Sequence, residues 1–85
     1  MNVDTRWIET NGTLVRTFKT PDFLTAFHLV SAVVAPAEAM NHHPDIAFGW
    51  GHVRITLTTH DAGGITDLDH RLAKAIDDAV KSFGL

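Results

Sequence analysis

Two pairs of short segments in this chain are rich in alternating apolar and polar residues, and each pair is followed by apolar residues at helical spacing. In the first pair, residues 7–10 and 13–19 carry mainly β-branched and apolar side chains. Asn11 and Gly12 lie between them, and this dipeptide is typical of a two-residue hairpin turn. The pattern predicts an antiparallel hairpin near the start of the chain.

A second hairpin is predicted at residues 46–50 and 53–59, around a turn at Gly51-His52. Alternation along the later segment separates two faces of a strand. The residues expected to face inward are Val53, Ile55 and Leu57, and those expected to face outward are Arg54, Thr56 and Thr58.

A long helix is predicted between the hairpins, with Thr20 as its N-cap and Pro21 at its first position. The residues expected to form its buried face are Phe23, Phe27, Val30, Val34 and Ala37. Pro36 removes a backbone hydrogen bond, so the segment either bends there or divides into two helices at residues 34–35. The helix must end before Pro44, because the residue ahead of a proline favours extended backbone.

Residues 66–69 resemble a capping box that opens a second helix, and Gly84 is expected to end it. The apolar face of this helix is predicted to contain Leu72, Ile76, Ala79, Val80 and Phe83. The order of elements is therefore ββαββα. We expect an α+β fold in which a four-stranded antiparallel sheet has both helices packed on one face, in a single domain over residues 1–85.

Composition narrows the classes of function. The 85 residues include 7 Lys+Arg and 10 Asp+Glu, which gives a net charge of −3. A protein that binds nucleic acid needs a basic face, so this composition argues against nucleic-acid binding. The absence of cysteine excludes disulfides, thiolate metal ligands and a thiol nucleophile. No stretch approaches about 18 apolar residues, and the first residues lack the apolar segment of a secretion signal. We therefore expect a cytoplasmic protein that binds neither membrane nor nucleic acid.

Six histidines are many for so small a chain. His42 and His43 follow the first helix and are held by Pro44, and His60 stands at the end of the best strand. Imidazole titrates near neutral pH, so these side chains are candidates for acid/base catalysis. The alternative is that residues 42–44 only end the helix. The remaining histidines, His28, His52 and His70, are expected at ordinary surface or turn positions.

Glu38 and Asp69 lie at the rims of the two predicted buried helix faces, where carboxylates can orient imidazoles. Each also has a simpler interpretation: Glu38 is solvated, and Asp69 is the third residue of the capping box. Adjacent histidines point apart in an extended segment, so their spacing does not favour a metal site, and we expect none.

These segments together resemble the pterin-4a-carbinolamine dehydratase family. The resemblance is carried by residues 37–44 (AEAMNHHP), 53–60 (VRITLTTH) and 64–69 (GITDLD), at separations typical of the family. Residues 22–27 also fit the start of the long helix in that family.

The resemblance implies dehydration of a 4a-hydroxytetrahydropterin to the quinonoid dihydropterin, in tetrahydrobiopterin recycling, with no metal or organic cofactor. It implies that His42, His43 and His60 are the catalytic histidines, with His42 and His60 as acid and base and His43 in binding. Glu38 and Asp69 would orient substrate or imidazoles. Members form homodimers or homotetramers and some serve other proteins, so a non-catalytic binding or assembly module is the alternative.

Two features depart from the family pattern. Members usually have a helix before the first strand, whereas Trp7 opens the strand here almost at once. Ile46 replaces a tryptophan found in many members, and Trp50 stands where an aromatic residue is common. We expect the missing helix to leave part of one sheet face uncovered, and exposed strand edges to favour association between copies.

Overall fold

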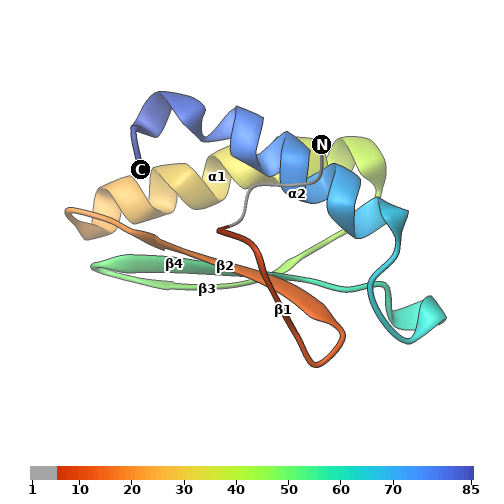
Figure 1. Ribbon diagram of the computed structural model, residues 1–85. Coiled ribbons are helices and arrows are strands. Elements are labelled where there is room, and N and C mark those ends of the chain that lie inside the picture. Colours follow the sequence, from red (N-terminus) through yellow and green to blue (C-terminus); the bar gives the residue numbers. More distant parts are fainter. Residues whose placement is uncertain (1–5) are drawn as a thin grey trace.

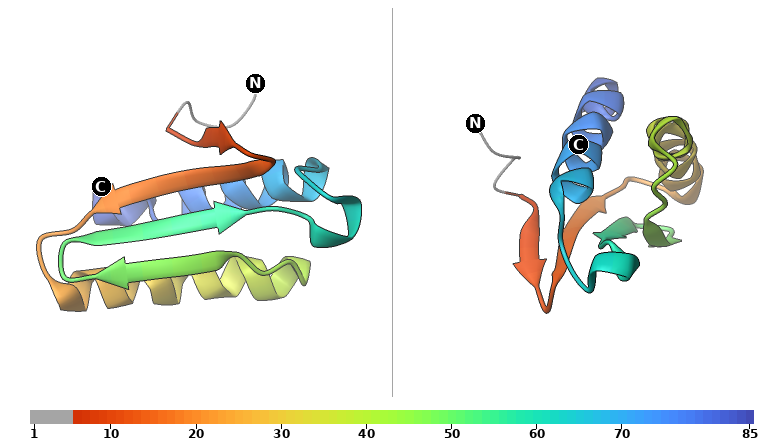
Figure 2. Two further views of the ribbon diagram at one scale, coloured as in Figure 1. Left: turned by 90° about the horizontal axis from the view of Figure 1, so that it is seen from below. Right: turned by 90° about the vertical axis from the view of Figure 1, so that its right-hand side faces the viewer.

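A computed structural model describes residues 6–85 of the chain (Figure 1). Its elements follow in the order β1 (Ile8–Thr10), β2 (Thr13–Lys19), α1 (Phe23–Met40), β3 (Asp45–Gly49), β4 (His52–Leu57), the 3₁₀ turn η1 (His60–Ala62), α2 (Asp67–Ala79) and the 3₁₀ turn η2 (Lys81–Phe83). The sheet has the order β1-β2-β4-β3 and every pair is antiparallel. Both helices cover one face of it (Figure 2), so the predicted α+β fold is confirmed.

The expectation that no helix precedes β1 concerns residues 1–5, which lie outside the described residues. The first hairpin turn is as predicted. Asn11 and Gly12 have φ angles of 50° and 77°, and a two-residue turn of this kind needs positive φ at both positions. The second turn lies one residue earlier than expected, at Trp50 and Gly51, because β4 already begins at His52.

Helix α1 runs without a break through Pro36, so the two-helix alternative is wrong. Its N-cap is Asp22 and not Thr20, because the Asp22 carboxylate accepts a hydrogen bond of 2.7 Å from the Thr25 backbone N–H. The Thr20 hydroxyl instead donates to the Trp50 carbonyl oxygen at 3.0 Å. Thr20 therefore ties the start of α1 to the β3–β4 turn.

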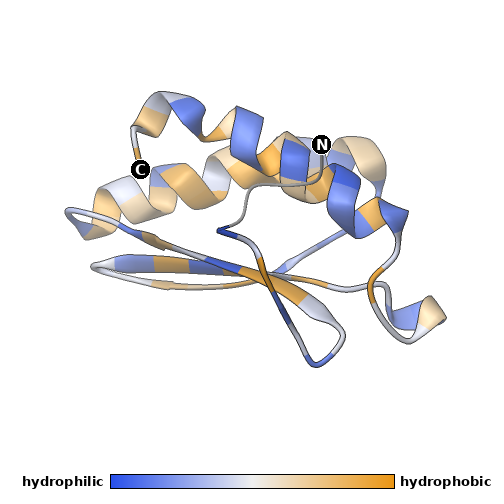
Figure 3. Cartoon of the chain, viewed as in Figure 1, coloured by the Kyte–Doolittle hydropathy of each residue, from blue (hydrophilic) through white to orange (hydrophobic). Residues whose placement is uncertain are grey.

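The predicted buried face of α1 is right at Ala37, partly right at Val30, which packs against the core, and wrong elsewhere. The buried residues are Ala26, Leu29, Val33 and Ala37, whereas Phe23, Phe27 and Val34 are exposed and Val30 is half-buried. Apolar residues lie on the exposed side of this helix as well as on its buried side, and Figure 3 shows apolar colour along much of its visible length. Their spacing therefore does not identify the face that packs on the sheet.

We expected no stretch of the chain to be long and apolar enough to span a membrane, but the 18 residues of α1 meet that criterion by length and composition. The core helix of a globular protein meets the same criteria, and one side of α1 packs against β3 and β4.

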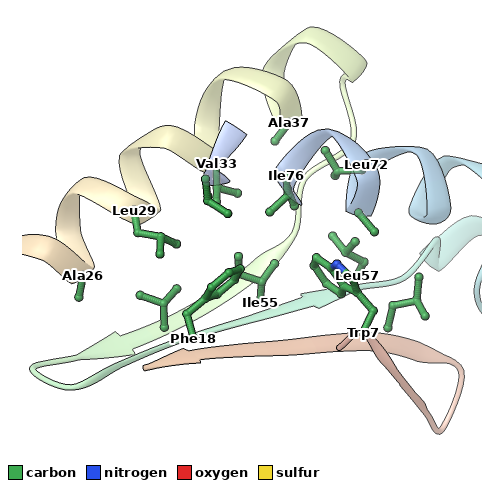
Figure 4. Close-up of a cluster of buried hydrophobic side chains, with 14 residues drawn as sticks. Trp7, Phe18, Ala26, Leu29, Val33, Ala37, Ile55, Leu57, Leu72 and Ile76 are labelled. Atoms are coloured by element: carbon green, nitrogen blue, oxygen red, sulfur yellow. The ribbon is translucent and has the colours of Figure 1, made fainter. Parts of the chain in front are cut away.

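The core lies between the sheet and the two helices (Figure 4). The inward-facing residues predicted for β4, Val53, Ile55 and Leu57, are fully buried. They belong to one core cluster with Leu29 and Val33 of α1 and with Leu72 and Ile76 of α2. The second helix is shorter than predicted, because α2 ends at Ala79 and Gly84 instead follows the 3₁₀ turn η2. Of the residues predicted for its apolar face, Val80 is also buried, while Ala79 and Phe83 are half-buried.

An ion pair inside this layer was not predicted from the sequence. Arg16 of β2 faces the helices with only 4% of its side chain exposed, and its Nη1 lies 2.5 Å from Asp77 Oδ1 of α2. The Trp7 indole N–H donates to the same oxygen at 2.8 Å. The Arg16 guanidinium also lies 4.1 Å from the centroid of the Phe18 ring. This cluster joins the start of the chain, β2 and α2.

Candidate active site

Three chain segments converge at one end of the molecule: the end of α1, the end of β4 with η1, and the start of α2 (Figure 2). Asn41 adopts the left-handed conformation, with φ 50°, and ends α1. The His42 backbone N–H then donates to the Ala37 carbonyl oxygen at 3.1 Å, which fixes the reversal of the chain. This local geometry brings the residues after α1 to the end of β4.

All three histidines predicted as catalytic line one pocket of about 300 Å³. The full lining is Asn41, His42, His43, Thr58, Thr59, His60 and Asp61. Pockets that hold small ligands begin at about this volume. His60 therefore shares one concavity with His42 and His43, which lie 18 and 17 positions earlier in the chain.

His42 forms a hydrogen bond with a buried carboxylate. Its Nε2 lies 2.6 Å from Asp69 Oδ1, and the exposed fractions of the two side chains are 13% and 0%. The other oxygen, Oδ2, accepts from the Thr66 backbone N–H and from the Thr59 hydroxyl, each at 2.8 Å. Asp69 therefore satisfies both interpretations of its sequence position: it caps the first turn of α2 and it orients an imidazole.

Burial alone would raise the pKa of the Asp69 carboxyl, because it penalises the charged form. The hydrogen bonds from His42, Thr66 and Thr59 outweigh that effect and lower the pKa below its ordinary value of 3.8. Asp69 is thus an anion at neutral pH. When the neutral His42 imidazole donates from Nε2 to this anion, Nδ1 is left as a proton acceptor.

His43 forms a more exposed pair. Its Nε2 lies 2.6 Å from Glu38 Oε2, with 56% and 67% of the two side chains exposed. Solvent screens such a pair, so it contributes little to stability. A second, more apolar pocket of about 140 Å³ lies beside it, lined by Val33, Val34, Ala37, Glu38, His43, Pro44 and Ile46. His43 therefore borders both pockets and can contact a ligand in either.

His60 is the first residue of η1, in a loop closed by two backbone hydrogen bonds. The Thr59 N–H donates to the Gly64 carbonyl oxygen at 2.9 Å, and the Gly64 N–H donates to the Thr59 carbonyl oxygen at 3.3 Å. The His60 imidazole has no hydrogen-bond partner within residues 6–85, and it is exposed at the pocket. Both of its ring nitrogens are available to a ligand.

Over residues 6–85, no group of three or more His, Cys, Asp and Glu side chains is arranged to hold a metal ion. The predicted capping box at residues 66–69 is confirmed, with Thr66 as the N-cap of α2. The sequence did not predict Thr59, whose hydroxyl donates to the same carboxylate, and its position directly before a candidate histidine was the only signal available. His28, His52 and His70 line neither pocket.

The family model described as pterin 4 alpha carbinolamine dehydratase matches residues 1–79. The chain belongs to this family. A protein of Chloroflexus aggregans, provisionally named pterin-4-alpha-carbinolamine dehydratase, is 51% identical over 84% of this chain and 76% of its own length. A protein of Chloroflexus aurantiacus with the same provisional name is 49% identical over 85% of this chain and 77% of its own. The family activity is the loss of water from a carbinolamine, which places this dehydratase family member among the hydro-lyases.

Solved structures show the same fold. The dehydratase family member has a TM-score of 0.79 and 31% identity to a transcriptional coactivator/pterin dehydratase of Brucella melitensis, over 88% of this chain and 82% of that one. A pterin dehydratase-like protein, described as a RuBisCO assembly factor of the alpha-carboxysome, has a TM-score of 0.68 at 23% identity, over 87% and 86% of the two chains. The second likeness concerns the fold alone.

The free energy of unfolding should vary with pH in the acid range because of Asp69. Because the pKa of Asp69 is lowered in the folded protein, its stabilising contribution is complete above the ordinary value of 3.8. This contribution is lost as the pH falls through the lower folded value. We expect Asp69→Asn to be less stable at neutral pH and to lose less stability between pH 5 and pH 2 than the wild type. Urea denaturation at a series of pH values measures this, and parallel curves for the two proteins would contradict it.

Proposed function

We propose that this protein dehydrates a 4a-hydroxytetrahydropterin to the quinonoid dihydropterin by histidine acid/base catalysis. The observation that carries the proposal is the shared pocket: His42, His43 and His60 line one concavity of about 300 Å³. Family membership supplies the class of substrate. The resemblance to the family supplies the role of these positions, and the geometry is compatible with it.

The reaction needs two proton transfers and no change of oxidation state. The 4a-hydroxyl accepts a proton and leaves as water when the C4a–O bond breaks. N5 loses its proton, and its electron pair forms the C4a=N5 double bond. Side chains that titrate near neutral pH suit both transfers, and each transfer contributes about 10²–10⁴-fold to the rate.

In this proposal His42 and His60 exchange the two protons with substrate. His42 presents Nδ1, because Nε2 is bound to Asp69. His60 presents either ring nitrogen, because no partner within residues 6–85 binds its imidazole. His43, held by Glu38 at the border of the two pockets, binds and orients the ring system.

The test is an assay of the purified protein with a 4a-hydroxytetrahydropterin, in which the absorbance of the quinonoid product is followed. We expect the rate to rise in proportion to enzyme concentration above the uncatalysed rate. A rate that does not depend on the protein, at pH values on both sides of 7, would overturn the proposal.

We propose further that the protein is a homodimer or homotetramer. Large apolar side chains are exposed on α1, on the edge strand β3 and in the turn that follows β3: Phe23, Leu24, Phe27, Val34, Phe48 and Trp50. A surface of this kind is typical of a protein interface. Light scattering of the purified protein gives the mass of the assembly.

The same surface supports a second candidate function, a non-catalytic module that binds another protein. The Brucella relative, described as a transcriptional coactivator as well as a pterin dehydratase, favours keeping this candidate. It would be preferred if the protein neither catalysed dehydration nor bound a dihydropterin, and instead formed a stoichiometric complex with a different protein.

A further inference from the structure

We propose that Thr59 is a positioning residue that holds His42 and His60 in a fixed spatial relation, an inference that rests on the proposed acid/base function. Thr59 contacts both parts of the proton-transfer machinery. Its side chain binds Asp69, the partner of His42, and its backbone closes the loop that carries His60. No other residue in the described chain makes both connections.

The hydrogen bonds around Thr59 have one consistent direction. Asp69 is ionised and can only accept, so the single hydroxyl proton of Thr59 is donated to Oδ2 at 2.8 Å. The Thr59 and Thr66 hydroxyl oxygens are 2.7 Å apart, and Thr66 must therefore be the donor to Thr59. The order Thr66 to Thr59 to Asp69 leaves Oδ1 as the acceptor for the His42 Nε2–H.

The backbone of Thr59 anchors the other histidine. Its N–H and C=O pair with Gly64, and its carbonyl oxygen also accepts from the Ala62 N–H at 3.0 Å. His60 lies inside this closed loop, one residue after Thr59. A shift of Thr59 would move His60 directly and would move His42 through the Asp69 carboxylate.

The neighbouring threonine shows that this arrangement is specific to position 59. The Thr58 hydroxyl donates to the Gly12 carbonyl oxygen at 3.0 Å, so it braces the first hairpin turn against the loop and does not reach Asp69. Thr59 has extended backbone angles, φ −109° and ψ 98°, which valine also favours. Thr59→Val therefore removes the hydroxyl without changing the shape of the side chain or straining the backbone.

The kinetic experiment compares Thr59→Val with Thr59→Ser and with Thr56→Val, a substitution of the same kind on the outer face of β4. We expect Thr59→Val to lower kcat by about 10- to 100-fold, the ratio that corresponds to one lost hydrogen bond to a charged group, with a smaller change in KM. Thr59→Ser restores the hydroxyl and should recover most of kcat, and Thr56→Val should retain wild-type kcat. A kcat for Thr59→Val within twofold of the wild type would overturn the proposal.

A second readout needs no substrate. The ¹⁵N shifts of the imidazoles in the resting protein report which ring nitrogen carries the proton. We expect His42 to be the Nε2–H tautomer in the wild type and a mixture of tautomers in Thr59→Val, with the single tautomer restored in Thr59→Ser. An unchanged tautomer in Thr59→Val would contradict the positioning role.

The two readouts separate this inference from the proposed function. If the wild type fails to dehydrate the carbinolamine while the tautomer of His42 depends on Thr59, the function fails and the positioning role stands. If Thr59→Val does not fold, Thr66→Val removes the donor to Thr59 and should shift the tautomer equilibrium and kcat in the same direction by a smaller factor. No shift in either quantity in Thr66→Val would overturn the inference.

Discussion

Replacing His42 with glutamine is expected to lower kcat for dehydration by about 10²–10⁴-fold, because one of the two proton transfers loses the imidazole that exchanges the proton with substrate. Glutamine cannot titrate near neutral pH, but its amide can still donate a hydrogen bond to the buried Asp69 carboxylate. The variant should therefore remain folded. Steady-state kinetics with the carbinolamine, together with circular dichroism of the same samples, measure both quantities.

The matched control is His28→Gln. His28 is an exposed histidine of α1 that lines neither pocket, so this variant should keep the wild-type kcat. If folded His42→Gln were as active as the control, His42 would have no role in proton transfer. A fall in kcat of similar size in both variants would show that the loss does not come from the pocket.

Removing Asp77 is expected to lower the free energy of unfolding by about 3–5 kcal/mol, because Asp77→Ala leaves the Arg16 guanidinium buried without its charge partner. The Trp7 indole N–H loses its acceptor in the same variant. Urea denaturation measures the difference. Activity of the folded fraction should be retained, because this cluster lines neither pocket.

Asp78→Ala is the control on the same helix. Asp78 forms an exposed pair with Lys81, 3.7 Å apart, and the loss of such a pair changes stability by about 1 kcal/mol or less. Replacing both buried charges, in an Arg16→Met/Asp77→Leu double variant, should cost less than Asp77→Ala alone, since no unpaired charge remains. Equal costs for Asp77→Ala and Asp78→Ala would show that burial of the ion pair has no energetic consequence.

The strands could be predicted from the sequence because their signals are local. Positive φ at Asn11 and Gly12 and the alternation of Val53, Ile55 and Leu57 each arise from adjacent residues. Helix α1 was predicted as an element, but its buried face was not. Phe23 and Leu29 are both apolar, and only the position of the sheet and of α2 decides that Leu29 is buried while Phe23 is exposed.

Some parts of the site could be predicted from the sequence and others could not. Residue type and family resemblance were enough to select the histidines, but the partner of each histidine could not be predicted. Asp69 was open to two interpretations, as a helix cap and as the partner of a histidine. Sequence position cannot show that both are true, because one carboxylate oxygen binds His42 and the other accepts from the Thr66 N–H. Arg16 was missed because an arginine on the inner face of a strand contradicts hydrophobic patterning unless its partner, 61 residues away, is already known.

The double use of Asp69 limits how this protein can change. One side chain holds the first turn of α2 and also the imidazole of His42, so a substitution chosen to strengthen the helix start would alter the pocket in the same step. A search for heat-resistant variants should therefore find gains at exposed helix positions and at the β1–β2 hairpin, and none at position 69. If the proposed mechanism holds, the same carboxylate supports both the start of α2 and the acid/base role of His42, so stability and activity cannot be changed independently at position 69.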